Sequence, residues 1–103
     1  ISKQGRALYA TSKTGLVGFT RSLSVEYAAS NILVNAVSPG FTLTDLTRAS
    51  LSSQQMTELA DQIPIGRFAD VEEIAKVVAF LASEENTYVT GQNLVTDGGF
   101  TIV

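Results

Sequence analysis

Hydrophobic positions in the first third of the chain recur at helical spacing. Between about residues 7 and 29, the apolar residues Leu16, Phe19 and Leu23 fall on one face of a helix. This pattern predicts one long helix over 7–29. Gly15 lies inside that helix, and so does Gly18. Each glycine costs about 1 kcal/mol relative to alanine there, so we expect both to permit close approach of a neighbouring element.

A short apolar run without polar alternation follows at residues 32–37. Such a run is typical of a strand that is buried on both faces of a parallel sheet. Ser38-Pro39-Gly40 is predicted to end this strand sharply. Asn35 is interpreted as a residue that ties the strand to its neighbour.

The middle of the chain changes to a mixed pattern over residues 41–63. We expect one or two short helices there, forming a mobile lid over a pocket. Residues 64–67 form a turn, and Asp70 with Glu73 has the spacing of a capping box that opens a helix. The apolar stripe of that helix consists of Ile74, Val77, Val78 and Leu81.

The last segment turns near Gly91, forms a short strand over 93–96 and closes with Asp97-Gly98-Gly99. The resulting order of helix, strand, lid, helix and strand indicates the α/β class with a parallel sheet. Two strands do not make a stable sheet of this class alone. We therefore expect a partner, either further chain or another copy.

Composition narrows the possible functions. The 103 residues fit one small domain, and 45% of them are apolar. The net charge is −3 and the sequence has no cluster of basic residues, so nucleic acid is not expected as a partner. The chain has no cysteine and no histidine. This excludes a histidine-based triad and the common metal-ligand sets, and no metal is expected. No apolar run reaches the roughly 20 residues that span a bilayer, and no signal peptide opens the chain, so a cytoplasmic protein is expected, without a membrane partner.

The chain starts at Ile1 rather than at methionine and enters its first helix within a few residues. We therefore expect it to be the later part of a longer protein.

Tyr9 and Lys13 are the main candidates for chemistry. Their spacing of four residues stacks a phenol and an ammonium on one helix face. A free phenol has a pKa near 10, and an adjacent cation favours the phenolate, so such a pair is a usable proton donor near neutral pH. The same spacing also occurs by chance in helices where the tyrosine packs at a core edge and the lysine is solvated.

Further motifs follow this pair in order, and together they resemble the C-terminal half of the short-chain dehydrogenase/reductase family over nearly the whole chain. They are Tyr9-x-x-x-Lys13, Val34–Val37 with Ser38-Pro39-Gly40, Thr42 and Thr44, Pro64-x-Gly66-Arg67, Ala79–Ser83, Thr90-Gly91-Gln92 and Asp97-Gly98-Gly99. The greatest likeness is to bacterial 3-oxoacyl-acyl-carrier-protein reductases, although sugar, polyol and hydroxysteroid dehydrogenases share these motifs.

The resemblance implies the fold and the organisation of the chain. Residues 1–103 are expected to form the C-terminal half of one domain, with a substrate lid at about 41–63. That half is the C-terminal part of a Rossmann-like, doubly wound parallel sheet with three layers (α/β/α). The N-terminal dinucleotide-binding half is absent from the sequence, which contains no Thr-Gly-x-x-x-Gly-x-Gly loop for the cofactor pyrophosphate.

The resemblance also implies the chemistry, an NAD(P)-dependent interconversion of a carbonyl and a secondary alcohol. Tyr9 acts as general acid/base, and Lys13 assists it and binds the nicotinamide ribose. Pro39 and Gly40 bring backbone close to the nicotinamide. Thr42 contacts its carboxamide through main-chain groups, and Thr44 offers a hydroxyl to the carboxamide or the pyrophosphate. The structural alternative for these four residues is a turn followed by capping threonines. The active-site serine and asparagine of the family precede the sequence.

The resemblance further implies NAD or NADP as cofactor and a small-molecule or acyl-carrier-borne carbonyl substrate. It implies a homo-oligomer, a tetramer in the full-length form. Asp97-Gly98-Gly99 is interpreted as structural, near the subunit contacts. The isolated chain is expected to be inactive, and the alternative function is a non-catalytic interaction module derived from this fold.

Overall fold

The computed structural model describes residues 4–102, so Ile1 lies outside the described residues. In chain order its elements are α1 (Ala7–Tyr27), the 3-10 helix η1 (Ala28–Ser30), β1 (Ala36–Pro39), α2 (Asp45–Ser50), α3 (Ser53–Ala60), α4 (Val71–Ala82) and β2 (Asn93–Thr96). The predicted order of a long helix, a strand, a segment of short helices, a further helix and a second strand is confirmed. Asn31 stops the first helix because it adopts a left-handed conformation, φ 59°, which asparagine tolerates.

The two strands form a parallel sheet, as predicted, in which Ala36 pairs with Asn93 and Pro39 pairs with Thr96. The strand expected at 32–37 was placed too early. The chain before Ala36 is joined to residues 89–92 through side chains as well as backbone. Asn35 donates to the Val89 carbonyl at 2.8 Å and accepts from the Gln92 amide at 3.0 Å, so it does tie the strand to its neighbour.

Pro39 is the last residue of β1, so the strand ends at Ser38-Pro39-Gly40 as predicted. The amides of Ala36 and Gly40 donate to the Gln92 and Thr96 carbonyls of the β2 side, at 2.8 and 3.0 Å. Backbone groups alternate in direction along a strand, so the position of Pro39 faces the outer edge of the sheet, where the missing N–H removes no ladder bond. The expected burial on both faces was wrong, because β1 is only half-buried and Pro39 is exposed.

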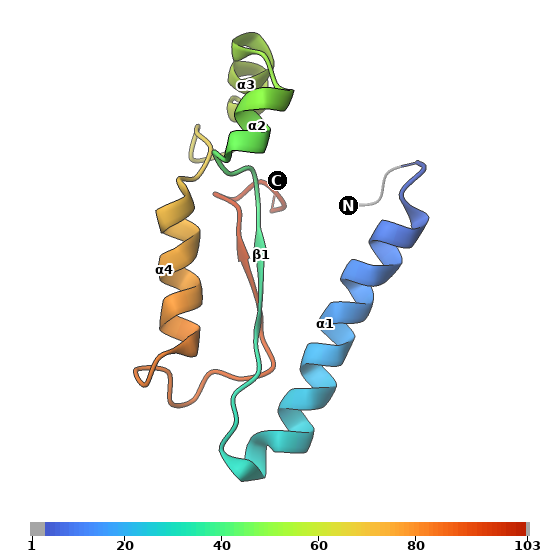
Figure 1. Ribbon diagram of the computed structural model, residues 1–103, viewed down its shortest axis with the longest axis vertical. Coiled ribbons are helices and arrows are strands. Elements are labelled where there is room, and N and C mark those ends of the chain that lie inside the picture. Colours follow the sequence, from blue (N-terminus) through green and yellow to red (C-terminus); the bar gives the residue numbers. More distant parts are fainter. Residues whose placement is uncertain (1–3, 103) are drawn as a thin grey trace.

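The elements lie in three layers, with the strands between α1 and α4 (Figure 1). Helix α4 begins after Asp70, as the sequence predicts, and packs beside β1. Ile74, Val77 and Leu81 of its apolar stripe are half-buried, whereas Val78 remains 47% exposed. The chain therefore has the α/β class expected for part of a doubly wound sheet.

Helix α1 meets the rest of the chain near its C-terminal end and diverges from the strands toward its N-terminus (Figure 1). Thr20 and Ser24 are its buried residues. A Cβ built on Gly91 would lie 2.6 Å from the Ser24 hydroxyl, so the helix approaches the Gly91 turn closely. The close approach expected at Gly15 and Gly18 was wrong for the described residues, because no atom lies within 4 Å of a Cβ built on either glycine.

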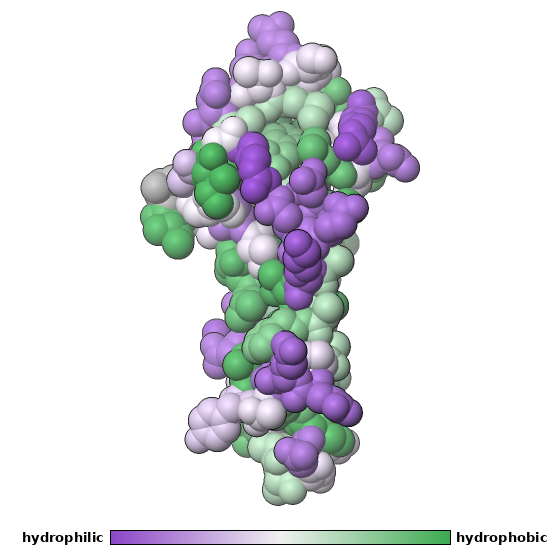
Figure 2. All heavy atoms as spheres, turned by 90° about the vertical axis from the view of Figure 1, so that its left-hand side faces the viewer, coloured by the Kyte–Doolittle hydropathy of each residue, from purple (hydrophilic) through white to green (hydrophobic). Residues whose placement is uncertain are grey.

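The molecule is extended and has little core. Its radius of gyration is 15.8 Å, compared with about 13 Å for a compact chain of this length. Its accessible surface is 7666 Å², roughly 2,000 Å² more than expected for a compact protein of this mass. Only Ile63 and Phe68 are buried hydrophobic residues among those described. Hydrophobic side chains are exposed along the waist of the face seen from the α4 side (Figure 2).

Candidate functional site

Tyr9 and Lys13 lie in the first turns of α1, on the same face of the helix. The Lys13 Nζ atom is 5.4 Å from the centroid of the Tyr9 ring. The ring is 52% exposed and Lys13 is exposed as well, so both side chains are open to a ligand. Ser12 does not take part, because its hydroxyl donates to the Tyr9 carbonyl at 2.8 Å within the helix.

Arg6 adds a second cation that the sequence analysis missed. Its Cζ atom lies 4.6 Å from the centroid of the same Tyr9 ring. Its spacing of three residues before Tyr9 was a signal that could have found it, because residues three apart are neighbours on a helix. Cations over an exposed ring contribute about 0.5–1 kcal/mol each, so the two help to hold the ring in place.

Pro39 and Gly40 lie where β1 ends. The Gly40 amide donates to the Thr96 carbonyl at 3.0 Å, which extends the pairing with β2 by one residue. A Cβ built on Gly40 would lie 2.7 Å from the Cβ of Asp97. Real Cβ contacts are not this short, so glycine is required here for the approach to Asp97.

Thr42 and Thr44 both make local hydrogen bonds. The Thr42 hydroxyl donates to the Gly40 carbonyl at 3.0 Å. The Thr44 hydroxyl caps α2 by accepting from the Thr47 amide at 3.1 Å. The capping alternative recognised in the sequence is thus present in the structure, and a cofactor contact by either threonine stays a prediction.

The two halves of the candidate site lie at the same end of the molecule. The N-terminal turns of α1 and the carboxyl ends of both parallel strands are all directed toward the end that carries α2 and α3 (Figure 1). In open α/β sheets, ligands bind outside the carboxyl ends of the strands. The structure therefore brings Tyr9 and Lys13 to the same end of the molecule as Pro39 and Gly40, although α1 diverges from the strands there.

The segment predicted to be a lid forms α2 and α3 and borders a cavity of about 370 Å³. Ser52 starts α3 with a capping box that it forms with Gln55. The cavity lies between α3 and the turn before α4, and its lining is mostly apolar with Arg67 and Asp70 among the polar residues. The cavity is lined by Leu43, Met56, Thr57, Ala60, Gly66, Arg67, Phe68 and Asp70. A pocket beside this segment is thus present.

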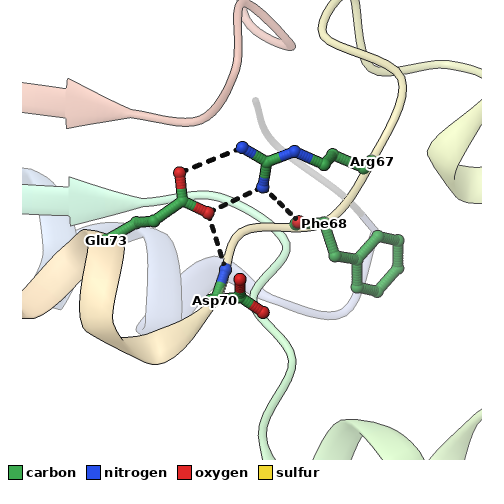
Figure 3. Close-up of polar contacts among 4 residues, drawn as sticks. All are labelled: Arg67, Phe68, Asp70 and Glu73. Atoms are coloured by element: carbon green, nitrogen blue, oxygen red, sulfur yellow. Dashed lines mark hydrogen bonds and ion pairs between the residues drawn. The ribbon is translucent and has the colours of Figure 1, made fainter.

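Arg67 and Glu73 form a two-pronged ion pair at the start of α4 (Figure 3). Their contacts are 2.6 Å for Nη1 to Oε1 and 3.0 Å for Nη2 to Oε2, and the Asp70 amide donates to Oε1 at 3.0 Å. The bonds from Arg67, followed by the Asp70 amide, lower the pKa of Glu73 to about 2. The bond from the Asp70 amide to Glu73 is the Glu73 half of the predicted capping box. The Arg67 guanidinium binds the same carboxylate.

Asn86 is a second residue whose importance the sequence did not reveal. It is only 6% exposed, and its amide group holds the turn between α4 and β2. It donates to the Leu81 and Val89 carbonyls and accepts from the Val89 amide. This residue therefore places β2 relative to α4.

The residues present fit one end of a nicotinamide cofactor. The N-terminal turns of α1, which carry the phenol and the ammonium, lie at the same end of the molecule as the glycine turn that follows β1. In dinucleotide folds a nicotinamide and its ribose hydroxyls are bound at the carboxyl ends of the strands. No residue of the sequence supplies the glycine-rich loop that holds a pyrophosphate. Among residues 4–102, no cluster of three or more acidic side chains could hold a metal ion, and no helix is long and apolar enough to cross a membrane.

Parallel strands between helical layers place the chain in the α/β class of folds. The chain belongs to the short-chain dehydrogenase/reductase family. Residues 1–101 match the family model described as enoyl-(acyl carrier protein) reductase. This confirms the family and the fold class that the sequence motifs predicted.

Similar proteins carry the name 3-oxoacyl-[acyl-carrier-protein] reductase FabG. The one from Escherichia coli (strain K12) is 50% identical over 99 residues, which are 96% of this chain and 40% of the relative. The one from Pseudomonas aeruginosa is 52% identical over 95 residues, 92% of this chain and 38% of the relative. The solved TT0495 protein from Thermus thermophilus has a TM-score of 0.82 and 41% identity, covering 92% of this chain and 40% of that one. The chain thus spans about 40% of the length of these proteins.

Proposed function

We propose that this chain acts as part of a longer NAD(P)-dependent oxidoreductase that interconverts a carbonyl and a secondary alcohol. The observation that carries the proposal is the Tyr9 and Lys13 pair, exposed on one face of α1 at the end where both parallel strands end. The remaining length of the protein would supply the glycine-rich loop and the other catalytic residues. The 103-residue chain alone is expected to be inactive.

Tyr9 would donate a proton from its phenol oxygen to the carbonyl oxygen during reduction, and would remove it from the alcohol in reverse. Lys13 and Arg6 place two positive charges over the Tyr9 ring and help to hold it in position. When bound, the nicotinamide supplies the hydride for the carbonyl carbon. Lys13 would bind its ribose hydroxyls, and Pro39 and Gly40 would bring backbone against its ring.

Thr42 and Thr44 complete the proposed cofactor contacts. Thr42 would contact the carboxamide through main-chain groups, and the Thr44 hydroxyl would reach the carboxamide or pyrophosphate. Because the Thr44 hydroxyl already caps α2, a bound cofactor would add to that contact or replace it. The first turn of α2 is thereby coupled to cofactor binding.

The proposed substrate is a 3-oxoacyl group on acyl-carrier protein. This rests on the identity of 44–52% to proteins named for that reaction. The description of the matched family model names a different reaction, the reduction of an enoyl group on acyl carrier protein. In that reaction a carbon–carbon double bond is reduced. General acid catalysis by a tyrosine suits a carbonyl oxygen, since that oxygen must gain a proton.

The test compares both substrates with the full-length protein that carries this chain. Oxidation of NADPH and of NADH is followed at 340 nm with a 3-oxoacyl thioester and with the matching enoyl thioester. The proposal expects turnover of the 3-oxoacyl substrate, with the enoyl substrate at least about 100-fold slower in kcat/KM. Preference for the enoyl substrate, or no turnover of either, would contradict it.

A second candidate is a non-catalytic interaction module, and the exposed apolar surface is the observation that favours it. Large exposed apolar areas on a small protein mark interfaces. In a full-length enzyme the same surface would be covered by the missing half of the sheet and by subunits of a homotetramer. Intact mass of the protein from its source separates the two. A species about 2.4 times this length supports the enzyme, and a product of 103 residues supports the module.

A further inference from the structure

The turn at residues 97–101 is closed by one carboxylate. Asp97 accepts hydrogen bonds from the Gly99 amide at 3.0 Å, the Thr101 amide at 2.9 Å and the Thr101 hydroxyl at 2.7 Å. The Thr101 hydroxyl, with help from the two amides, holds the pKa of Asp97 below its usual value. Gly98 and Gly99 have φ values of 65° and 92°, which glycine adopts without strain. The turn is therefore a defined structure held by Asp97.

This turn contacts the end of the segment 41–63. The Ile65 amide donates to the Gly98 carbonyl at 3.2 Å. A Cβ built on Gly98 would lie 2.9 Å from Ile63 Cγ2, and one built on Gly99 would lie 3.0 Å from Pro64 Cγ. Ile63 is 3% exposed, so this contact is part of the small core.

The same turn contacts the start of the segment. The ring of Phe100 meets the ring of Phe41 edge-on, with centroids 5.2 Å apart. Phe41 also stacks on Phe68 at 5.3 Å, and the Ala69 amide donates to the Phe41 carbonyl at 2.9 Å. Both ends of the segment that carries α2 and α3 thus converge on one turn.

The turn also supports the end of β1. Gly40 is packed directly against Asp97, and its amide donates to the Thr96 carbonyl. Gly40 is one of the residues proposed above to face the nicotinamide. A change in the conformation of the turn would therefore shift the Gly40 backbone and both ends of the segment 41–63.

We propose that Asp97 is a positioning residue, which holds the turn 97–101 closed and so fixes both ends of the segment 41–63 and the Gly40 backbone for catalysis. The catalytic part of this inference rests on the proposed function, and the structural part does not. In this proposal Asp97 does not itself act on the substrate or the cofactor. It acts through Phe100, Gly98 and its own backbone.

The test uses the full-length protein with the variants Asp97→Ala and Asp97→Asn. Asparagine keeps the shape and one side-chain oxygen that can accept a hydrogen bond, whereas alanine keeps neither. With Asp97→Ala, amide hydrogen exchange of residues 43–63 is expected to rise about tenfold, while exchange in α4 changes by less than about twofold. The KM for the carbonyl substrate is expected to rise about fivefold with a smaller change in kcat. In Asp97→Asn the single side-chain oxygen can still accept the two Thr101 bonds but not the Gly99 bond as well, so this variant should restore part of the exchange protection and part of the KM.

Equal increases in exchange for residues 43–63 and α4, or no increase in either, would overturn the proposal. Failure of Asp97→Asn to restore part of the exchange protection and part of the KM would overturn it too. If Asp97→Ala does not fold, Thr101→Val removes only the 2.7 Å hydroxyl bond and should give a smaller change with the same regional pattern. An inactive wild-type protein would defeat the proposed function, and the exchange result would still decide the role of Asp97.

Discussion

Replacing Asn86 with alanine should destabilise the protein strongly for a residue in a surface turn. The side chain donates to the Leu81 carbonyl at 3.1 Å and to the Val89 carbonyl at 3.0 Å. It accepts from the Val89 amide at 2.9 Å and, more weakly, from the Tyr88 amide at 3.3 Å. Because Asn86 is 6% exposed, water reaches these partners poorly in the folded state.

The magnitude follows from the three shorter bonds. Each is worth about 1 kcal/mol net, so Asn86→Ala should lower the free energy of unfolding by about 3 kcal/mol. This is a large part of the 5–15 kcal/mol that is typical of a whole domain. Asn86→Asp should be at least as damaging, because it retains the acceptors but places carboxylate oxygens against the Leu81 and Val89 carbonyls.

Equilibrium urea unfolding, followed by circular dichroism, measures these changes in wild-type and variant protein. Thr87→Ala is the matched control, since Thr87 is exposed in the same turn and a surface substitution there should stay within about 0.5 kcal/mol. If Asn86→Ala lost less than about 1 kcal/mol, the reasoning that this side chain holds the turn would be refuted.

Two further predictions concern charge and backbone. The Arg67 bonds lower the pKa of Glu73 from 4.5 to about 2. The folded state therefore binds the Glu73 proton less tightly than the unfolded chain does, so the stability that the pair contributes is present above pH 4.5 and is lost as the pH falls toward 2. Unfolding midpoints of Glu73→Gln measured over this range should vary less with pH than those of the wild type; an unchanged pH dependence would count against the pair. Gly91→Ala should lower Tm more than Gly66→Ala, because both have positive φ but only a Cβ at Gly91 meets Ser24; equal losses would show that this contact is unimportant.

Local signals in the sequence predicted the elements well. Asp70 with Glu73 identified the start of α4, and the periodic apolar residues identified α1 and α4. The apolar run at 32–37 identified a strand but misplaced its bounds. Pairing in a sheet depends on a partner that is distant in the sequence, and the side chains of Asn35 and Thr90 delay the ladder until Ala36.

Features that depend on long-range contacts could not be predicted in this way. The convergence of Asp97, Gly40 and Phe41 joins residues more than 50 positions apart, and no spacing rule relates them. Only the part of the candidate site whose residues are close in the sequence, the pair Tyr9 and Lys13, could be recognised from spacing. The close approach that the sequence suggested at Gly15 finds no partner among residues 4–102, because no atom of this part of the chain lies within 4 Å of a Cβ built there.

The central claim is that Tyr9 transfers the proton, and Tyr9→Phe in the full-length protein tests it most directly. Steady-state reduction of a 3-oxoacyl thioester gives kcat, and fluorescence titration with NADPH gives the dissociation constant of the cofactor. We predict that kcat falls by about 10²–10⁴ while the cofactor dissociation constant changes less than about threefold. A variant that keeps the wild-type kcat would contradict the claim.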